Sequence, residues 1–179
     1  MALRKASSYS KKKTRPYTRK SKARVKAYIK TIPQMKVVKF SMGNQGAFLG
    51  NKHNYAVKLV AEQKVLIRDN ALESCRMLIN KLLDRDALGQ YYFAIKVYPH
   101  HILRENKTAG GTAGADRIST GMQQSFGVTI GRAAIVQNGK EIFFISCENE
   151  NIARTAKRIL THVKAKVPCK TRIVFEKIG

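Results

Sequence analysis

The first 61 residues of this 179-residue chain contain no aspartate or glutamate, and the first acidic residue is Glu62. The same 61 residues carry sixteen lysines and arginines, whereas residues 62–179 carry nineteen basic and eleven acidic residues. The formal net charge is +24, and self-repulsion of this size works against a compact free domain. A polyanionic partner would relieve it, and nucleic acid is the commonest one, so the sequence predicts nucleic-acid binding.

Cysteines and long apolar runs are also scarce. Cys75, Cys147 and Cys169 form no C-x-x-C pair and are odd in number, which argues against a disulfide framework and a zinc finger. We expect them to be small, buried, apolar residues in a reducing cytosol. No run of 18 apolar residues occurs, and the basic N-terminus lacks the apolar stretch of a signal peptide. We therefore expect a cytoplasmic protein without membrane contact.

Signatures of catalysis and nucleotide binding are missing as well. His100 and His101 stand near Glu105 and Asp116, but their spacing matches no known set of metal ligands. We expect both histidines to be RNA contacts or surface residues. The glycines of residues 110–114 could cradle a phosphate, yet no Gly-Lys-Ser/Thr element follows them. The sequence predicts no enzyme, no metal site and no cofactor.

Residues 1–33 form a basic front end, which we call the N-terminal arm, with twelve lysines and arginines. Residues 20–30 could form one basic helix when neutralised, but we expect an extended arm that is ordered only by its partner. Tyr9, Tyr17 and Tyr28 could stack on bases or ribose, or anchor the arm on the domain. The residues predicted to bind nucleic acid are Arg4, Lys5, Lys11, Lys12, Lys13, Arg15, Tyr17, Arg19, Lys20, Lys22, Arg24 and Lys26.

Apolar periodicity predicts the elements of the remaining chain. Residues spaced by three and four indicate a helix at about 70–84, with Asp69 as its N-cap and Arg76, Asn80 and Lys81 facing outward. A second helix is expected from Asn149 or Asn151 to about Lys166, and a short one at 119–126. Alternating residues predict strands at 35–40, 55–68 with a break near Glu62, 91–98, 133–137, 141–147 and 170–178.

Two connections carry further predictions. Residues 41–54 are rich in Gly and Asn and are expected to be a loop. Asn138-Gly139 is the strongest turn signal of the chain and predicts a hairpin between residues 133–137 and 141–147. Since each long helix has one apolar stripe, we expect residues 34–179 to form one α+β domain, with two main helices on one face of a largely antiparallel sheet.

Residues 104–117 are rich in Gly and Ala, and basic residues stand at both ends. We call them the glycine-rich loop. Ordered domains seldom keep a loop of this length without a function, so we predict a functional loop whose backbone approaches nucleic acid closely.

Residues 98–107 read Tyr-Pro-His-His-Ile-Leu-Arg-Glu-Asn-Lys, and Ala-Gly-Ala-Asp-Arg, Thr-Gly-Met and Phe-Gly follow at 113–117, 120–122 and 126–127. This series resembles the signature of one ribosomal protein family, called L-sixteen in bacteria and L-ten-e in archaea and eukaryotes. The chain is most similar to the archaeal form. Pro-Tyr-Thr-Arg at 16–19 and further short matches extend the resemblance over nearly the whole chain.

The resemblance implies a hammerhead-like fold and a position on large-subunit rRNA, beside the paths of the A-site and P-site tRNAs. Its implied partners are large-subunit rRNA, with 5S rRNA left open, both tRNAs and neighbouring ribosomal proteins. In that family the matching loop helps tRNA placement and is not catalytic. The loop residues that we carry over are Arg104, Asn106, Lys107, Gly114, Asp116 and Arg117, and we add Gly110 and Gly111 to the predicted tRNA-facing loop.

The residues alone leave two other functions open. One is a free architectural protein that binds duplex DNA, since phosphate contacts do not separate RNA from DNA. The other is an RNA-modifying enzyme, which would depend on His100 or Asp116.

Overall fold

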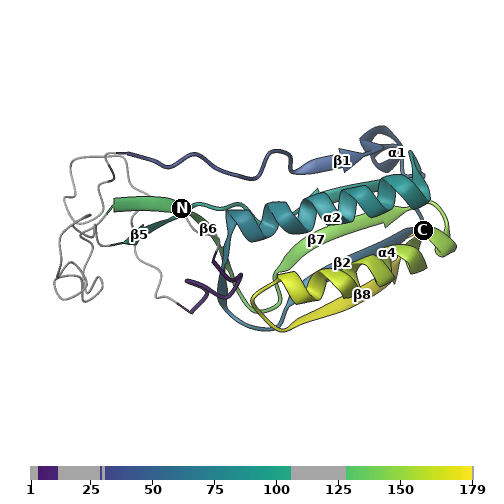
Figure 1. Cartoon of the computed structure of the whole chain (residues 1–179). Helices are drawn as coiled ribbons and strands as arrows, with labels where there is room; N and C mark the ends of the chain where they lie inside the picture. The colour runs from purple at the N-terminus through teal and green to yellow at the C-terminus, as the bar shows by residue number, and fades with distance from the viewer. Residues whose placement is uncertain (1–3, 12–28, 30, 106–127, 179) are drawn as a thin grey trace, which may run out of the picture.

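The structure is a computed structural model that describes residues 4–11, 29, 31–105 and 128–178 (Figure 1). The helical elements are α1 (Gln45–Leu49), α2 (Asp69–Ala87), α4 (Glu150–Val163) and the 3-10 turn η2 (Lys164–Lys166). The strands are β1 (Ser41–Gly43), β2 (Tyr55–Ala61), β3 (Val65–Arg68), β4 (Tyr91–Ile95), β5 (His101–Glu105), β6 (Val128–Val136), β7 (Glu141–Cys147) and β8 (Thr171–Lys177).

The strands form two antiparallel sheets. The larger sheet has the order β1-β4-β7-β2-β8, and the smaller one has the order β3-β6-β5. Helices α2 and α4 lie next to each other on one face of the larger sheet (Figure 1). This arrangement confirms the predicted α+β class, with a largely antiparallel sheet and two main helices.

The main core lies between the two long helices and the larger sheet, as the alternating and helical patterns require. The strands contribute alternate residues, among them Val57, Leu59, Phe93, Ile95, Phe143 and Ile145. The helices contribute one stripe each, among them Leu72, Cys75, Ile79, Leu83, Ala156, Leu160 and Val163. The opposite face of the sheet carries a smaller cluster, in which Phe48 of α1 stacks on Tyr92 with 4.6 Å between ring centroids.

The expected strand at residues 35–40 is wrong. The apolar alternation in this segment reflects packing, since Val37 is buried in the main core. The backbone N–H groups of Lys36 and Val38 donate to the carboxylates of Asp69 and Glu73 on α2 instead of to a neighbouring strand. The short strand β1 follows at residues 41–43, where a loop was expected.

The residues expected as a loop also contain the helix α1. Asn44 caps this helix, because its Oδ1 accepts a hydrogen bond from the backbone N–H of Ala47 at 3.0 Å.

The predicted hairpin around Asn138-Gly139 is wrong, although the turn itself is present. Gly139 has φ +77°, and the N–H of Lys140 donates to Gln137 O at 3.2 Å. However, β6 pairs with β3 and β5, whereas β7 pairs with β2 and β4. The turn therefore connects two sheets. The predicted break near Glu62 is confirmed, and it separates β2 from β3 at the same corner, where the N–H of Gly139 donates to Ala61 O at 2.8 Å.

Several element ends differ from the prediction. Asp69 is the first residue of α2 and not its N-cap, because its buried carboxylate accepts from the N–H groups of Lys36 and Asn70. Arg76 is half-buried in an ion pair with Glu73 instead of facing outward. The strand expected at 91–98 ends at Ile95. A short helix expected at 119–126 lies outside the described residues.

Candidate nucleic-acid interface

The smaller sheet defines where the glycine-rich loop leaves the domain. Glu105 ends β5 directly opposite Val128, which begins β6. Residues 106–127 therefore leave and rejoin the sheet at adjacent positions. Arg104 and Glu105 belong to β5, so the prediction that the loop begins at residue 104 is wrong by two residues. The other predicted loop residues, Asn106, Lys107, Gly110, Gly111, Gly114, Asp116 and Arg117, lie outside the described residues.

The first described part of the arm, residues 4–11, packs on one face of this sheet (Figure 1). The N–H of Leu66 in β3 donates to Ser10 O at 3.0 Å. Nη2 of Arg68 donates to the carbonyl oxygens of Arg4 at 2.8 Å and Lys5 at 3.0 Å. Three backbone carbonyls of the arm are thus held by the end of β3.

Tyr9 fixes the same segment through its ring. It packs against the cluster of Leu66, Leu103 and Ala133, which come from the three strands of the smaller sheet. Of the two roles considered for the arm tyrosines, Tyr9 takes the anchoring one. Tyr17 and Tyr28 lie outside the described residues.

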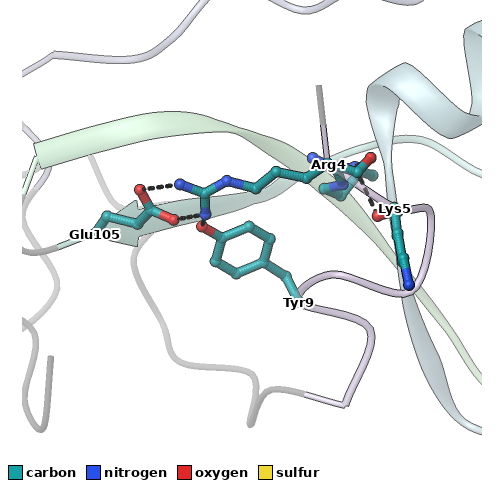
Figure 2. A network of polar contacts seen from close by, with 5 residues as sticks. Arg4, Lys5, Tyr9 and Glu105 are labelled. Atoms are coloured by element: carbon teal, nitrogen blue, oxygen red, sulfur yellow. Dashed lines mark hydrogen bonds and ion pairs between the residues drawn. The ribbon is translucent and has the colours of Figure 1, made fainter. Parts of the chain in front are cut away.

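The guanidinium of Arg4 contacts the carboxylate of Glu105 at the base of the loop (Figure 2). Nη2 donates to Oε2 at 2.9 Å, and Nη1 contacts both Oε1 and the Tyr9 hydroxyl. Arg4, a predicted nucleic-acid contact, thus forms an ion pair within the protein.

Lys5 and Lys11 are exposed, as their predicted role requires. The remaining predicted contacts of the arm lie outside the described residues, namely Lys12, Lys13, Arg15, Tyr17, Arg19, Lys20, Lys22, Arg24 and Lys26.

The later part of the arm contacts the opposite face of the smaller sheet. Ile29 is buried against Ile102 of β5, with Ile32 beside them. Consecutive strand residues point to opposite faces, so Ile102 faces away from Leu103 and Tyr9. On the side of Ile102, Nε of Arg132 donates to the carbonyl of Pro33 at 2.7 Å. The arm is therefore fixed to both faces of the sheet that carries the loop.

The two histidines have different environments. His101 is buried in β5, which lowers its pKa through desolvation, so its expected surface position is wrong. His100 is exposed, as expected, and its ring centroid lies 4.4 Å from that of Tyr98.

Tyr98 in turn stacks on Phe40, with ring centroids 5.2 Å apart and planes inclined by 20°. We call Phe40, Tyr98 and His100 the aromatic row. Tyr98 is 42% exposed, and unstacked RNA bases bind to such partly exposed rings. The row has no signal in the sequence, because Phe40 and Tyr98 are far apart along the chain.

The cysteines fit their predicted role. Cys75 and Cys147 are buried and Cys169 is half-buried, all three as free thiols. Burial raises the pKa of Cys75 and Cys147 to about 12 and that of Cys169 to about 11. Among the described residues, no group of three or more His, Cys, Asp or Glu side chains is placed to hold a metal ion. Likewise, none of the described helices is long and apolar enough to cross a membrane.

Comparison with known proteins gives one consistent family. A sequence profile described as ribosomal protein L16p/L10e matches residues 12–174. The chain is 45% identical over 178 residues to the large ribosomal subunit protein uL16 of Methanococcus maripaludis, covering 99% of this chain and 96% of that protein.

Two further archaeal relatives carry the same name. The protein of Staphylothermus marinus is 41% identical over 177 residues, which cover 98% of this chain and 95% of the relative. The protein of Archaeoglobus fulgidus is 42% identical over 164 residues, which cover 91% of this chain and 87% of the relative. The similarity thus extends over both the arm and the domain.

Proposed function

This chain belongs to the ribosomal protein L16p/L10e family, and we propose that its arm binds large-subunit rRNA and its glycine-rich loop helps to position tRNA. As a member of this family it is a structural protein of the large ribosomal subunit and not an enzyme. The observation that carries the proposal is the fixation of the arm to both faces of the sheet from which residues 106–127 emerge. An arm held by rRNA would thereby hold the loop in a defined position.

The arm supplies affinity in this proposal. Its lysines and arginines contact backbone phosphates, which hold the protein in place without reading sequence. Lys5, Lys11 and the eight further predicted lysines and arginines make these contacts, while Arg4 fastens the arm to Glu105. The partners would be large-subunit rRNA and neighbouring ribosomal proteins in the cytoplasmic ribosome. Whether 5S rRNA is a further partner is left open.

The loop supplies the specific contribution to translation. Its glycines and alanines let the backbone approach a tRNA closely. Asn106, Lys107, Asp116 and Arg117 of the loop, with Arg104 of β5 beside them, provide polar contacts to the A-site or P-site tRNA. We further propose that the aromatic row stacks on an unpaired rRNA base, because the rings of Tyr98 and His100 are exposed just before β5.

The arm can be tested by the salt dependence of rRNA binding. Changing Lys11, Lys12 and Lys13 together to Gln should weaken binding and reduce the log–log salt slope by about 0.7–0.9 for each lost phosphate contact. The matched control changes the same three lysines to Arg, which keeps the charge and should keep the slope. An unchanged slope in the glutamine variant would contradict the role of the arm.

The loop is tested separately by deleting residues 108–114. The deletion should leave the domain folded and bound to the large subunit, because it lies well inside residues 106–127, beyond both flanking strands. Steps that depend on tRNA should be impaired. Normal translation by subunits that carry the deletion would refute the tRNA role. Sedimentation with the large subunit also separates the proposal from the alternative of a free DNA-binding protein.

A further inference from the structure

A second basic feature lies where the arm meets the start of α2. Here a pocket of about 370 Å³, which we call the basic pocket, is lined by eight described residues, of which three are cationic, namely Arg4, Arg68 and Lys166. Asn70 and Ser74 of α2 also line it. The cations come from the arm, from the residue that ends β3, and from η2. Tertiary structure thus brings three charges to one cavity, and no acidic residue is among the described residues that line it.

The charges around the pocket are unequally compensated. Arg4 is paired with Glu105. Lys166 makes no ion pair with any described carboxylate, and its Nζ donates to the hydroxyl of Ser74 at 3.1 Å. The uncompensated charge of the pocket therefore lies mainly on Lys166 and Arg68.

Asp69 is the nearest acid in sequence, but its side chain is not part of the pocket lining. Its carboxylate is buried and accepts from the backbone N–H groups of Lys36 and Asn70. Desolvation raises its pKa, although the charge of Arg68 acts in the opposite direction. The hydrogen bonds of the Arg68 guanidinium go to backbone carbonyls of the arm and not to this carboxylate.

The donors in the pocket are oriented before any ligand binds. The Arg68 guanidinium is held by two backbone carbonyls through Nη2 alone. Its Nε is shielded from solvent and has no hydrogen-bond partner among the described residues. Ser74 Oγ accepts from Lys166, which leaves the hydroxyl proton free to point toward a third group. Such an arrangement suits an anion with several acceptor oxygens.

We propose that the basic pocket binds one backbone phosphate of large-subunit rRNA, with Lys166 and Arg68 contacting its oxygens and Ser74 donating a hydrogen bond. This inference rests on the proposed rRNA binding and adds a defined phosphate site to it. An RNA backbone fits better than a free anion because Arg4 and Ala6 of the arm line the pocket. A strand that follows the arm would pass this opening.

The site itself can be tested with inorganic phosphate and the full chain. In an NMR titration, the amide signals of Asn70, Ser74 and Lys166 should shift in a saturable manner. Lys166→Met should abolish these shifts, whereas Lys81→Met, which removes an exposed charge from α2 outside the pocket, should retain them. Absence of saturable shifts, or equal shifts in Lys166→Met, would overturn the phosphate site.

Binding to protein-free large-subunit rRNA tests the occupant. Lys166→Met should weaken the affinity roughly tenfold, the effect of losing one charge-assisted hydrogen bond. Ser74→Ala should weaken it less and should not affect folding, because Ala is favourable in a helix. Arg68 is left unchanged because it also holds the arm.

The rRNA affinity of Lys166→Met is compared with that of the arm variant, in which Lys11, Lys12 and Lys13 are changed to Gln. If Lys166→Met binds rRNA like the wild type while the arm variant is weakened, the pocket proposal fails and rRNA binding by the arm stands. If both variants bind like the wild type, the proposed function of the arm fails as well. Weakening of both variants supports both proposals.

Discussion

Arg4 and Glu105 are 101 positions apart in the sequence, yet Nη2 of the arginine donates to Oε2 of the carboxylate at 2.9 Å (Figure 2). The pair joins the start of the arm to the last residue of β5, from which the loop departs. Both side chains are partly exposed, at 41% and 27%. An ion pair of this kind adds little to global stability, so its consequence is local: it fixes residues 4–11 on the smaller sheet.

Glu105→Gln should loosen residues 4–11 without unfolding the domain. The N–H of Leu66, which donates to Ser10 O, should then exchange with solvent up to about fivefold faster, because exposed ion pairs contribute at most about 1 kcal/mol. Native-state hydrogen exchange measures this rate. Glu62→Gln, which removes an exposed acid outside the pair, should leave it unchanged. Wild-type exchange at Leu66 in Glu105→Gln would show that the ion pair does not hold the arm.

Tyr98 provides a test of the aromatic row. Replacing the ring by Ala should weaken rRNA binding by about 1–3 kcal/mol, which is the contribution of one base–aromatic stack. Tyr98→Phe keeps the ring and should bind like the wild type. Filter binding at fixed salt compares the two variants. Equal losses in both would assign the effect to the hydroxyl group and contradict stacking.

The buried His101 makes folding stability depend on pH. Burial holds its folded-state pKa below the ordinary value of 6.5, so the unfolded chain takes up the proton first as the pH falls. The contribution of His101 to stability should therefore be constant above about pH 6.5 and decrease below it, by at most about 1.4 kcal/mol per pH unit for one proton.

His53, whose pKa is also lowered by burial, adds to the same decrease. Urea unfolding at several pH values measures the profile. The profile of His101→Gln should be flatter than that of the wild type, whereas His100→Gln, a change at the exposed neighbour, should keep the wild-type slope. Identical slopes in all three proteins would contradict the assignment to His101.

The sequence predicted the helices better than the strand partners, for a physical reason. The predicted stripe of Leu72, Cys75, Ile79, Leu82 and Leu83 is a local pattern, and these residues are buried except Leu82, which is half-buried against the core. Strand pairing is decided by distant segments. The Asn138-Gly139 turn therefore connects two sheets, although its local signal is that of a hairpin.

The candidate site shows the same limit. The excess of positive charge predicts the arm, and the motif at residues 98–107 identified the family, because both are continuous in sequence. The pair of Arg4 and Glu105, the aromatic row and the basic pocket each join segments from distant parts of the chain. None of them has a local signature.

Gly43 shows where the backbone itself restricts the residue type. Its φ is +83°, and a Cβ atom at this position would overlap the carbonyl oxygen of Tyr91. That oxygen also accepts the N–H of Asn44, the N-cap of α1, at 2.7 Å. A side chain at Gly43 would thus disturb both the pairing of β1 with β4 and the start of α1.

Gly43→Ala should destabilise the protein by about 2–5 kcal/mol, the sum of the left-handed backbone penalty and local overpacking. Gly139→Ala is the matched control, because its φ is +77° but no atom lies within 4 Å of the added Cβ. The control should lose only about 1–2 kcal/mol. Urea unfolding followed by circular dichroism gives both values. Equal losses would mean that the contact with Tyr91 contributes nothing and that β1 can move away from β4 at no cost.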